Sequence, residues 1–212
     1  MKEARAAVSH IEANFPISDL ADIAWQQAEP IRVTTYWSGE TAPLGRHFDA
    51  RLLWSDTHIY ARFDAEQREE LIVNSAPDLT QKTDGLWERD VCEIFLAPHR
   101  ARRTRYFEFE VAPTGEWLDL LIEIVGDVRR TDREFTSQME SAAKIGDGNV
   151  TMAMKVPFST LCAKPKLGDV WLGNIFRCIG SGATRGYLSW QPTHTEKPAF
   201  HVPGAFSEIE FR

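Results

Sequence analysis

The chain has 212 residues, of which 43% are hydrophobic and 26% are charged, and its formal net charge at pH 7 is −7. This composition is that of a globular protein and excludes an intrinsically disordered chain. A chain of this length can bury about 70% of its unfolded surface, so the fold needs no disulfide. The negative charge disfavours nucleic acid and anionic membrane as partners, and no apolar run is long enough to span a bilayer.

The start of the chain and its cysteines bear on the cellular compartment. Residues 1–5 lead into no continuous apolar segment, so the sequence gives no sign of a signal peptide. Cys92, Cys162 and Cys178 are widely spaced and form no Cys-x-x-Cys motif, which is typical of reduced thiols. We therefore expect a cytoplasmic protein.

One short helix is expected near the amino terminus. Ser18 is a candidate N-cap, and apolar residues follow it from Leu20 to Trp25. We assign residues 1–24 to an amino-terminal segment that contains this helix. Residues 25–212 form one β domain, because no Gly/Ser-rich or Pro-rich linker divides them.

The rest of the chain alternates apolar and polar residues with a period of two. Turn signals such as Pro113-Thr114-Gly115 separate these segments at intervals near ten residues, and a single helical turn is expected at 157–161. Many short strands without long helices predict an all-β fold, an antiparallel β-sandwich. The predicted strands are 31–37, 50–54, 59–64, 91–96, 105–111, 117–125, 150–155, 170–179, 186–190 and 206–211.

The segment Val91–Leu96 is apolar on both faces, which is typical of a central strand. Glu93 therefore lies on a face that should be buried, where a carboxylate needs a cation or several hydrogen bonds. Two interpretations stay open: a structural ion pair, for example with Arg177, or a carboxylate that accepts hydroxyl groups from a ligand. Trp87 and Trp190 flank turns or strand edges, where each suits either the core or a ligand platform.

Two loops resemble phosphate-binding or polyanion-binding elements but are better explained as hairpin loops. The glycine-rich loop at 180–186 follows an apolar strand, as a dinucleotide loop would, yet the residues after it look extended and not helical. The basic segment His99–Arg105 lies between two predicted strands, so we expect a solvated hairpin tip.

Two other chemistries remain as alternatives. No pair of histidines has zinc-binding spacing, but Met152, Met154 and His201 are side chains of the kinds that ligate haem iron, so a haem-binding or electron-transfer sandwich is one alternative. The other is a glycoside hydrolase that uses Glu93 with Glu108 or Glu110, since such enzymes need paired carboxylates.

Several motifs follow one another in a fixed order along the chain. They are Leu53-Trp54-Ser55-Asp56-Thr57-His58-Ile59-Tyr60, Trp87 to Leu96, Tyr106 to Pro113, Lys155-Val156-Pro157-Phe158, Gly173-Asn174-Ile175-Phe176-Arg177, Ser189-Trp190 and Phe206 to Phe211. Together they resemble family 9 carbohydrate-binding modules and their relatives in the DOMON-like β-sandwich superfamily. The resemblance runs from about Trp25 to the C-terminus.

This resemblance implies non-catalytic carbohydrate binding, with a glycan chain end or small saccharide gripped between two tryptophans, in carbohydrate catabolism. It implies that Trp87 and Trp190 are the platforms and that Glu93 accepts hydroxyl groups, with Glu110 and Arg177 as weaker binding candidates. It leaves secretion open and suggests a separate glycan-degrading enzyme as a partner. Family members can bind calcium, but no Asp-x-Asp-x-Asp-Gly loop assigns it here, so we expect no cofactor.

Overall fold

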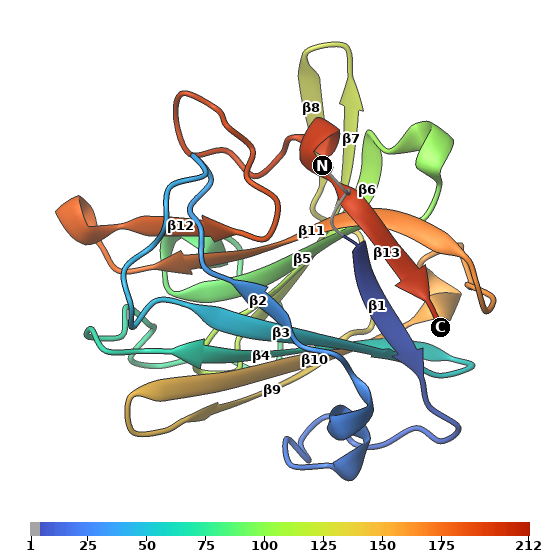
Figure 1. The fold of residues 1–212 in the computed structure, drawn as a ribbon, viewed down its shortest axis with the longest axis horizontal. Helices are drawn as coiled ribbons and strands as arrows, with labels where there is room; N and C mark the ends of the chain where they lie inside the picture. The colour runs from blue at the N-terminus through green and yellow to red at the C-terminus, as the bar shows by residue number, and fades with distance from the viewer. Residues whose placement is uncertain (1–4) are drawn as a thin grey trace.

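The structure, a computed structural model, describes residues 5–212 and is built from β-strands and short 3-10 helices (Figure 1). No helix in this range is long and apolar enough to cross a membrane. The strands are β1 Arg5–His10, β2 Ile31–Val33, β3 Phe48–Trp54, β4 His58–Glu66, β5 Val91–Ala97, β6 Arg105–Val111, β7 Trp117–Val125, β8 Val128–Asp132, β9 Glu140–Ile145, β10 Asn149–Pro157, β11 Val170–Ile179, β12 Gly186–Ser189 and β13 Ser207–Phe211. The 3-10 helices are η1 Ile23–Gln27, η2 Leu86–Glu88, η3 Arg100–Arg102, η4 Phe158–Thr160, η5 Gly182–Thr184 and η6 Pro203–Ala205.

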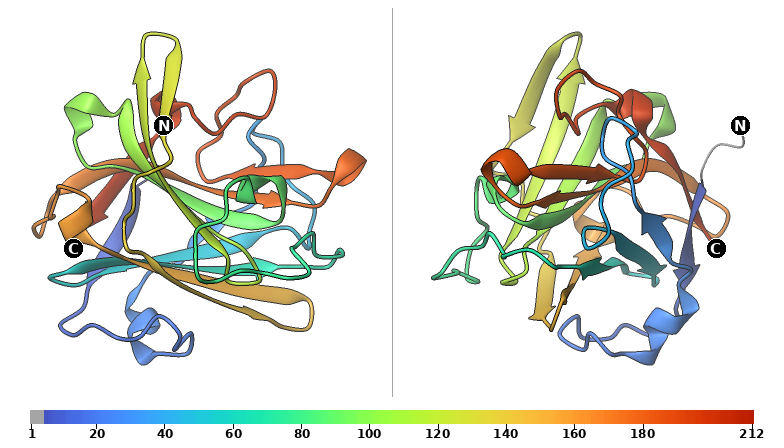
Figure 2. Two further views of the ribbon diagram at one scale, coloured as in Figure 1. Left: turned by 180° about the vertical axis from the view of Figure 1, so that it is seen from behind. Right: turned by 60° about the vertical axis from the view of Figure 1, so that its left-hand side comes forward.

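All of these strands belong to one curled, mixed sheet with the order β8-β7-β6-β5-β11-β13-β1-β3-β4-β10-β9. β12 pairs with β11 and β2 pairs with β3 at the side of this path. Every pairing is antiparallel except those of β1, which runs parallel to both β13 and β3. β1 therefore joins the two halves of the sheet, and the two halves curl toward one another (Figure 2).

The curled sheet has an inner face and an outer face. The inner face carries one apolar core, and the outer face carries a separate apolar cluster on each half of the sheet. We call the cluster over β5, β6, β7 and β11 the outer cluster. The inner core gathers residues of β3, β4 and β10 together with residues of β5, β6 and β11. Alternation along β5 shows the division, because Cys92, Ile94 and Leu96 belong to the inner core while Val91 and Phe95 belong to the outer cluster. Both faces of β5 are thus buried, as the sequence predicts for a central strand.

The all-β class is confirmed, and nine of the ten predicted strands are found with small shifts of their ends. The strand predicted at 31–37 is shorter, because β2 ends at Val33 and only isolated bridges follow at Thr35 and Tyr36. The fold differs from a purely antiparallel sandwich because β1 pairs in parallel on both sides and closes the two halves into one sheet. β1 lies within residues 1–24 and was not predicted, and neither were β8 and β9. β8 and β9 face solvent over most of their length, so they lack the apolar alternation that reveals a strand.

The expected amino-terminal helix is only a 3-10 turn, η1, and its N-cap is Asp22 and not Ser18. The Asp22 side chain accepts a hydrogen bond from the backbone N–H of Ala24 at 2.8 Å. The helical turn predicted at 157–161 is confirmed as η4. The loop at 180–186 joins β11 and β12 as an antiparallel hairpin, and the basic segment at 99–105 joins β5 and β6.

The junction at β1 generates a prediction on stability. Ile209 of β13 pairs with Ala6 of β1 and is fully buried in the inner core. Ile209→Ala should lower the free energy of unfolding by about 2–5 kcal/mol, because a cavity adds to the lost apolar contacts. Urea unfolding measures this loss. Leu44→Ala is the matched control, since Leu44 is 75% exposed, and a loss there as large as at Ile209 would contradict this description of the core.

Candidate functional site

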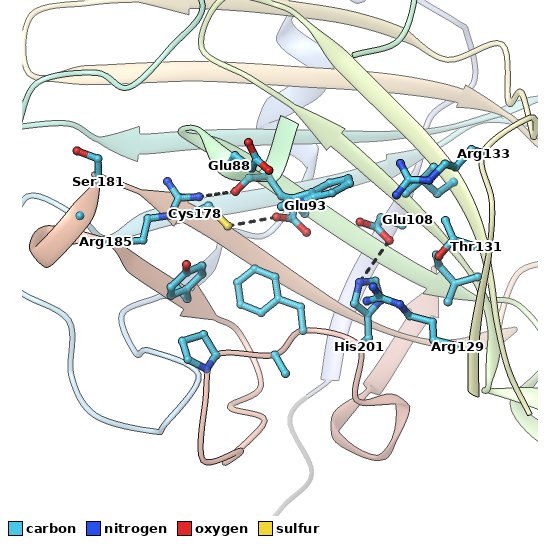
Figure 3. Close-up of a pocket in the computed structure, with 18 residues that line it drawn as sticks. Glu88, Glu93, Glu108, Arg129, Thr131, Arg133, Cys178, Ser181, Arg185 and His201 are labelled. Carbon is cyan, nitrogen blue, oxygen red and sulfur yellow. Dashed lines mark hydrogen bonds and ion pairs between the residues drawn. The ribbon is translucent and has the colours of Figure 1, made fainter. Parts of the chain in front are cut away.

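A cavity of about 730 Å³ opens on the outer face of the sheet, and we call it the outer cavity. Its floor comes from β5, β6, β7 and β11, and its walls come from η2, the β7–β8 hairpin, β12 and the segment before η6 (Figure 3). It combines aromatic, acidic and basic side chains. Its lining includes the aromatic residues Trp87, Tyr187 and Phe200, the acidic residues Glu93 and Glu108, the imidazole of His201, and the basic residues Arg129, Arg133 and Arg185.

Three aromatic side chains form the walls of the outer cavity. Trp87 lies in η2, which follows Gly85 at φ 76°, and the guanidinium carbon of Arg133 lies 5.7 Å from its ring centroid. Tyr187 of β12 meets Phe200 edge to face at 6.0 Å between centroids, and Phe200 stacks on Phe176 of β11 at 4.0 Å. These contacts fix the aromatic groups on a rigid part of the sheet.

The floor of the outer cavity is acidic. Glu93 of β5 accepts a weak hydrogen bond from the Cys178 thiol at 3.5 Å, and Glu108 of β6 has an oxygen 3.9 Å from Nε2 of His201 (Figure 3). Glu110 lies opposite Glu93 in the β5–β6 register. One carboxylate oxygen from each of the three glutamates lies within 4.8 Å of the others. We call Glu93, Glu108 and Glu110 the glutamate cluster.

Burial and mutual repulsion shift the proton affinities in the glutamate cluster. Burial raises the pKa of Glu93, and the nearby charge of Glu108 raises it further. Burial also raises the pKa of Glu108 and of Glu110, and the charges of Glu93 and Glu108 add to the shift at Glu110. Burial lowers the pKa of His201 to about 3, so His201 is uncharged at neutral pH and does not neutralise the acids.

The family description "Carbohydrate family 9 binding domain-like" matches residues 17–211 of this chain. The chain belongs to the carbohydrate family 9 binding domain-like family. The resemblance in the sequence is thereby confirmed over nearly the whole chain.

Solved structures share the fold of this family 9-like domain at low sequence identity. A candidate carbohydrate-binding protein from Bacteroides uniformis is similar with a TM-score of 0.78 and 18% identity, over 100% of both chains. A family 9 carbohydrate-binding module from Caldicellulosiruptor kristjanssonii in complex with cellotriose is similar with a TM-score of 0.69 and 17% identity, over 99% of this chain and 94% of that one. The glucose complex of that module gives the same TM-score and identity, over 99% and 96%.

A curated relative is an "Extracellular protein" of Arthroderma benhamiae. It is 21% identical over 175 residues, which cover 76% of this chain and 77% of the relative.

The structure brings some of the predicted site residues of the family 9-like domain together and separates others. Trp87 and Glu93 both line the outer cavity, and Glu110 joins Glu93 in the glutamate cluster. Trp190 packs against the inner core and does not line the outer cavity, so it does not face Trp87 across it.

Arg177 also lies on the inner side of the sheet and forms no ion pair with Glu93. It is 2% exposed, and its Nη1 donates to the backbone carbonyl oxygens of Arg46 and Glu66 at 2.7 Å. Its Nη2 donates to the side chain of Gln67. Arg177 therefore ties β11 to the end of β4 and to the loops beside it.

Tyr187 and Phe200 line the outer cavity but were not among the predicted residues. Tyr187 had a usable signal, because a period of two along β12 puts it on the opposite face from Leu188, which is an inner core residue. By the same alternation Trp190 follows Leu188 to the inner side. Phe200 lies outside any strand, so periodicity could not place it.

The candidate haem ligands do not share a site. Met152 and Met154 belong to the inner core, whereas His201 lies in the outer cavity with Nδ1 2.8 Å from the Tyr106 hydroxyl. The two groups are on different faces of the sheet, so one haem cannot take axial ligands from both.

The raised pKa values in the glutamate cluster predict that the protein becomes less stable as the pH rises, when a chelator keeps the cluster free of metal ions. The folded-state pKa of Glu93 is raised from 4.5 to about 8, so the folded state holds its proton where the unfolded state has lost it. The contribution is therefore fully present below pH 4.5 and is lost as the pH rises toward 8. Thermal unfolding should show the Tm falling by several degrees, roughly 2–4 °C per kcal/mol, between pH 5 and pH 8.

The variant Glu110→Gln is the control for this pH effect, because it keeps the shape of the side chain and removes one titrating group. Its Tm should fall less between pH 5 and pH 8 than that of the wild-type protein. A Tm profile equal to the wild-type profile at every pH would contradict the raised pKa of Glu110.

Proposed function

We propose that this family 9-like domain binds a saccharide in the outer cavity and catalyses no reaction. The observation that carries the proposal is the combination of Trp87 and Tyr187 with Glu93 and Glu108 around one cavity. A pyranose ring has apolar C–H faces and a polar rim of hydroxyl groups. Aromatic walls suit its faces, and a carboxyl floor suits its rim.

The raised pKa values of the glutamate cluster add to this fit. A protonated carboxyl group both donates and accepts a hydrogen bond, as a sugar hydroxyl does. The cluster can therefore satisfy hydroxyl groups of either orientation. Burial of some tens of Å² of sugar on each ring contributes a few kcal/mol at about 25 cal/mol per Å². After association costs of at least about 4 kcal/mol, the expected Kd is about micromolar to millimolar.

The family suggests the class of saccharide. The module from Caldicellulosiruptor kristjanssonii was solved with cellotriose and with glucose, so a glucose-containing chain end or small oligosaccharide is our first candidate. We place this binding in carbohydrate catabolism, with a separate glycan-degrading enzyme as the partner.

The geometry of the carboxyl groups argues against the glycoside hydrolase. Such an enzyme needs two carboxyl groups on either side of the scissile bond, about 5–9.5 Å apart. Glu93, Glu108 and Glu110 all rise from adjacent strands on one face of the sheet, so they would meet a bound sugar from the same side. We expect no turnover of aryl glycosides by the wild-type protein, and turnover that disappears in Glu93→Gln would contradict the binding proposal.

Substitution of Trp87 tests the saccharide proposal directly. Calorimetric titration with cellotriose and glucose should show binding to the wild-type protein. The Kd should rise at least about tenfold in Trp87→Ala, because one face of the sugar loses its apolar cover, which is worth about 1.4 kcal/mol or more.

Trp190→Ala is the matched control for Trp87→Ala, because Trp190 is also half-buried but packs against the inner core. Its Kd should stay within about threefold of the wild-type value wherever circular dichroism shows a folded protein. Loss of binding in folded Trp190→Ala with full binding in Trp87→Ala would place the sugar elsewhere and contradict the proposal.

A further inference from the structure

The glutamate cluster places three buried carboxyl groups side by side among apolar residues, which do not stabilise charge. Glu93, Glu108 and Glu110 are 1%, 3% and 0% exposed, and they point to the same side of the sheet from adjacent antiparallel strands. Around them lie outer-cluster residues such as Phe95, Leu118 and Leu120. Three acids in such a setting need a partner, because an unpaired buried carboxylate costs several kcal/mol or more.

The described residues supply too few partners for these oxygens. Oε2 of Glu108 and both carboxylate oxygens of Glu110 are buried and accept no hydrogen bond from an N–H group or a hydroxyl group of residues 5–212. The carboxyl groups of Glu108 and Glu110 contact one another, and they can share a hydrogen bond only if one of them holds a proton. Within this range Glu93 accepts only the weak hydrogen bond from the Cys178 thiol. Glu110, with both oxygens unpartnered, is directed into the cluster, since one of them lies within 4.8 Å of oxygens of the other two glutamates.

Within residues 5–212, the cationic side chains around the outer cavity form no salt bridge with the glutamate cluster. Burial raises the pKa of Glu93 and of Glu108, and the charges of Arg185 and Arg129 oppose this only partly. Arg185 donates to the backbone carbonyl oxygens of Gly180, Trp87 and Arg89. Arg133 pairs with Asp84, and Arg129 is exposed at the rim. Figure 3 shows Arg129 beside His201, on the side of the cavity where Glu108 lies. No salt bridge from Arg or Lys to the glutamate cluster exists in the described part of the chain.

The size and the donor set of the cluster indicate a class of ligand. Carboxylate oxygens are the donors preferred by hard divalent cations. Two ligands on opposite sides of a metal ion are separated by twice the bond length, which is about 4.6–5.2 Å for Ca²⁺ and about 4.0–4.2 Å for Mg²⁺. Oxygens that all lie within 4.8 Å of one another are close enough to share either ion. Three carboxylate ligands favour calcium, because Mg²⁺ is usually bound through only one or two carboxylates.

We propose that Glu93, Glu108 and Glu110 bind one divalent cation, calcium by the type and number of its carboxylate ligands, at the floor of the outer cavity. Glu93 and Glu108 line the cavity, which gives the ion a path from solvent. The open coordination positions face the cavity and hold water. The ion does not need a sugar in order to bind. It would displace the protons of the cluster, so that Glu93 and Glu108 then meet a sugar only as hydrogen-bond acceptors.

Calorimetric titration of chelator-treated protein with calcium chloride tests the cation site. We expect one ion per chain and a rise in Tm at millimolar calcium, because an ion that binds only the folded state stabilises it. Terbium is a second probe, and Trp87 in the wall of the same cavity should sensitise its luminescence. Magnesium should bind at least about tenfold more weakly than calcium.

Glu110→Gln should weaken calcium binding at least about tenfold without a loss of Tm in chelator-treated protein. Glu93→Gln is the second variant, so the test survives if one of them fails to fold. Glu123→Gln is the matched control, since Glu123 lies on the adjacent strand β7 with its side chain 43% exposed, beside Arg105, and outside the cluster.

Three results would overturn the cation proposal. The first is no heat and no Tm shift with calcium, which would mean that shared protons satisfy the cluster. The second is calcium binding that is unchanged in folded Glu110→Gln and Glu93→Gln, which would place the ion elsewhere. The third is magnesium binding tighter than calcium binding, which would contradict the choice of calcium as the ion. Saccharide titrations with and without calcium separate this outcome from that of the saccharide proposal.

Discussion

The register between β5 and β6 concentrates three carboxyl groups on the outer face of an otherwise apolar sheet. Glu93 and Glu110 are direct partners, and Glu108 lies two residues along the same face. A slip of β6 by one residue would turn Glu108 and Glu110 toward the inner core and leave Glu93 alone on the outer face. The inner faces of β5 and β6 carry apolar residues of the inner core, so the acids lie on the outer face, where Glu93 and Glu108 line the outer cavity. The position of the site is in this sense a consequence of strand pairing.

Loops then decide what the acidic floor can bind. η2 places Trp87 just before β5, and the segment before η6 brings Phe200 and His201 over the sheet. These elements supply apolar walls, whereas the strands supply polar groups. The sheet is shared with structures that are only 17–18% identical, so the fold tolerates wide substitution.

The sequence predicts the strands well because a period of two survives wherever one face is buried. It also predicts that Trp87 and Glu93 belong to one region, since they are six positions apart at the start of a central strand. Alternation groups Trp190 with Leu188 and Arg177 with Ile175, but the sequence alone does not say which of the two faces is the inner one. Only the pairing of β11 with β12 shows that both lie on the inner side. β1 escaped prediction because two of its residues are alanines and its neighbours in the sheet are distant in the chain.

The most direct test of the central claim is a crystal structure of the protein soaked with cellotriose. The account predicts a pyranose ring in the outer cavity, with one face against Trp87 and a hydroxyl group hydrogen-bonded to the carboxyl of Glu93. A sugar bound at another surface, or an outer cavity filled by protein side chains in the crystal, would contradict it.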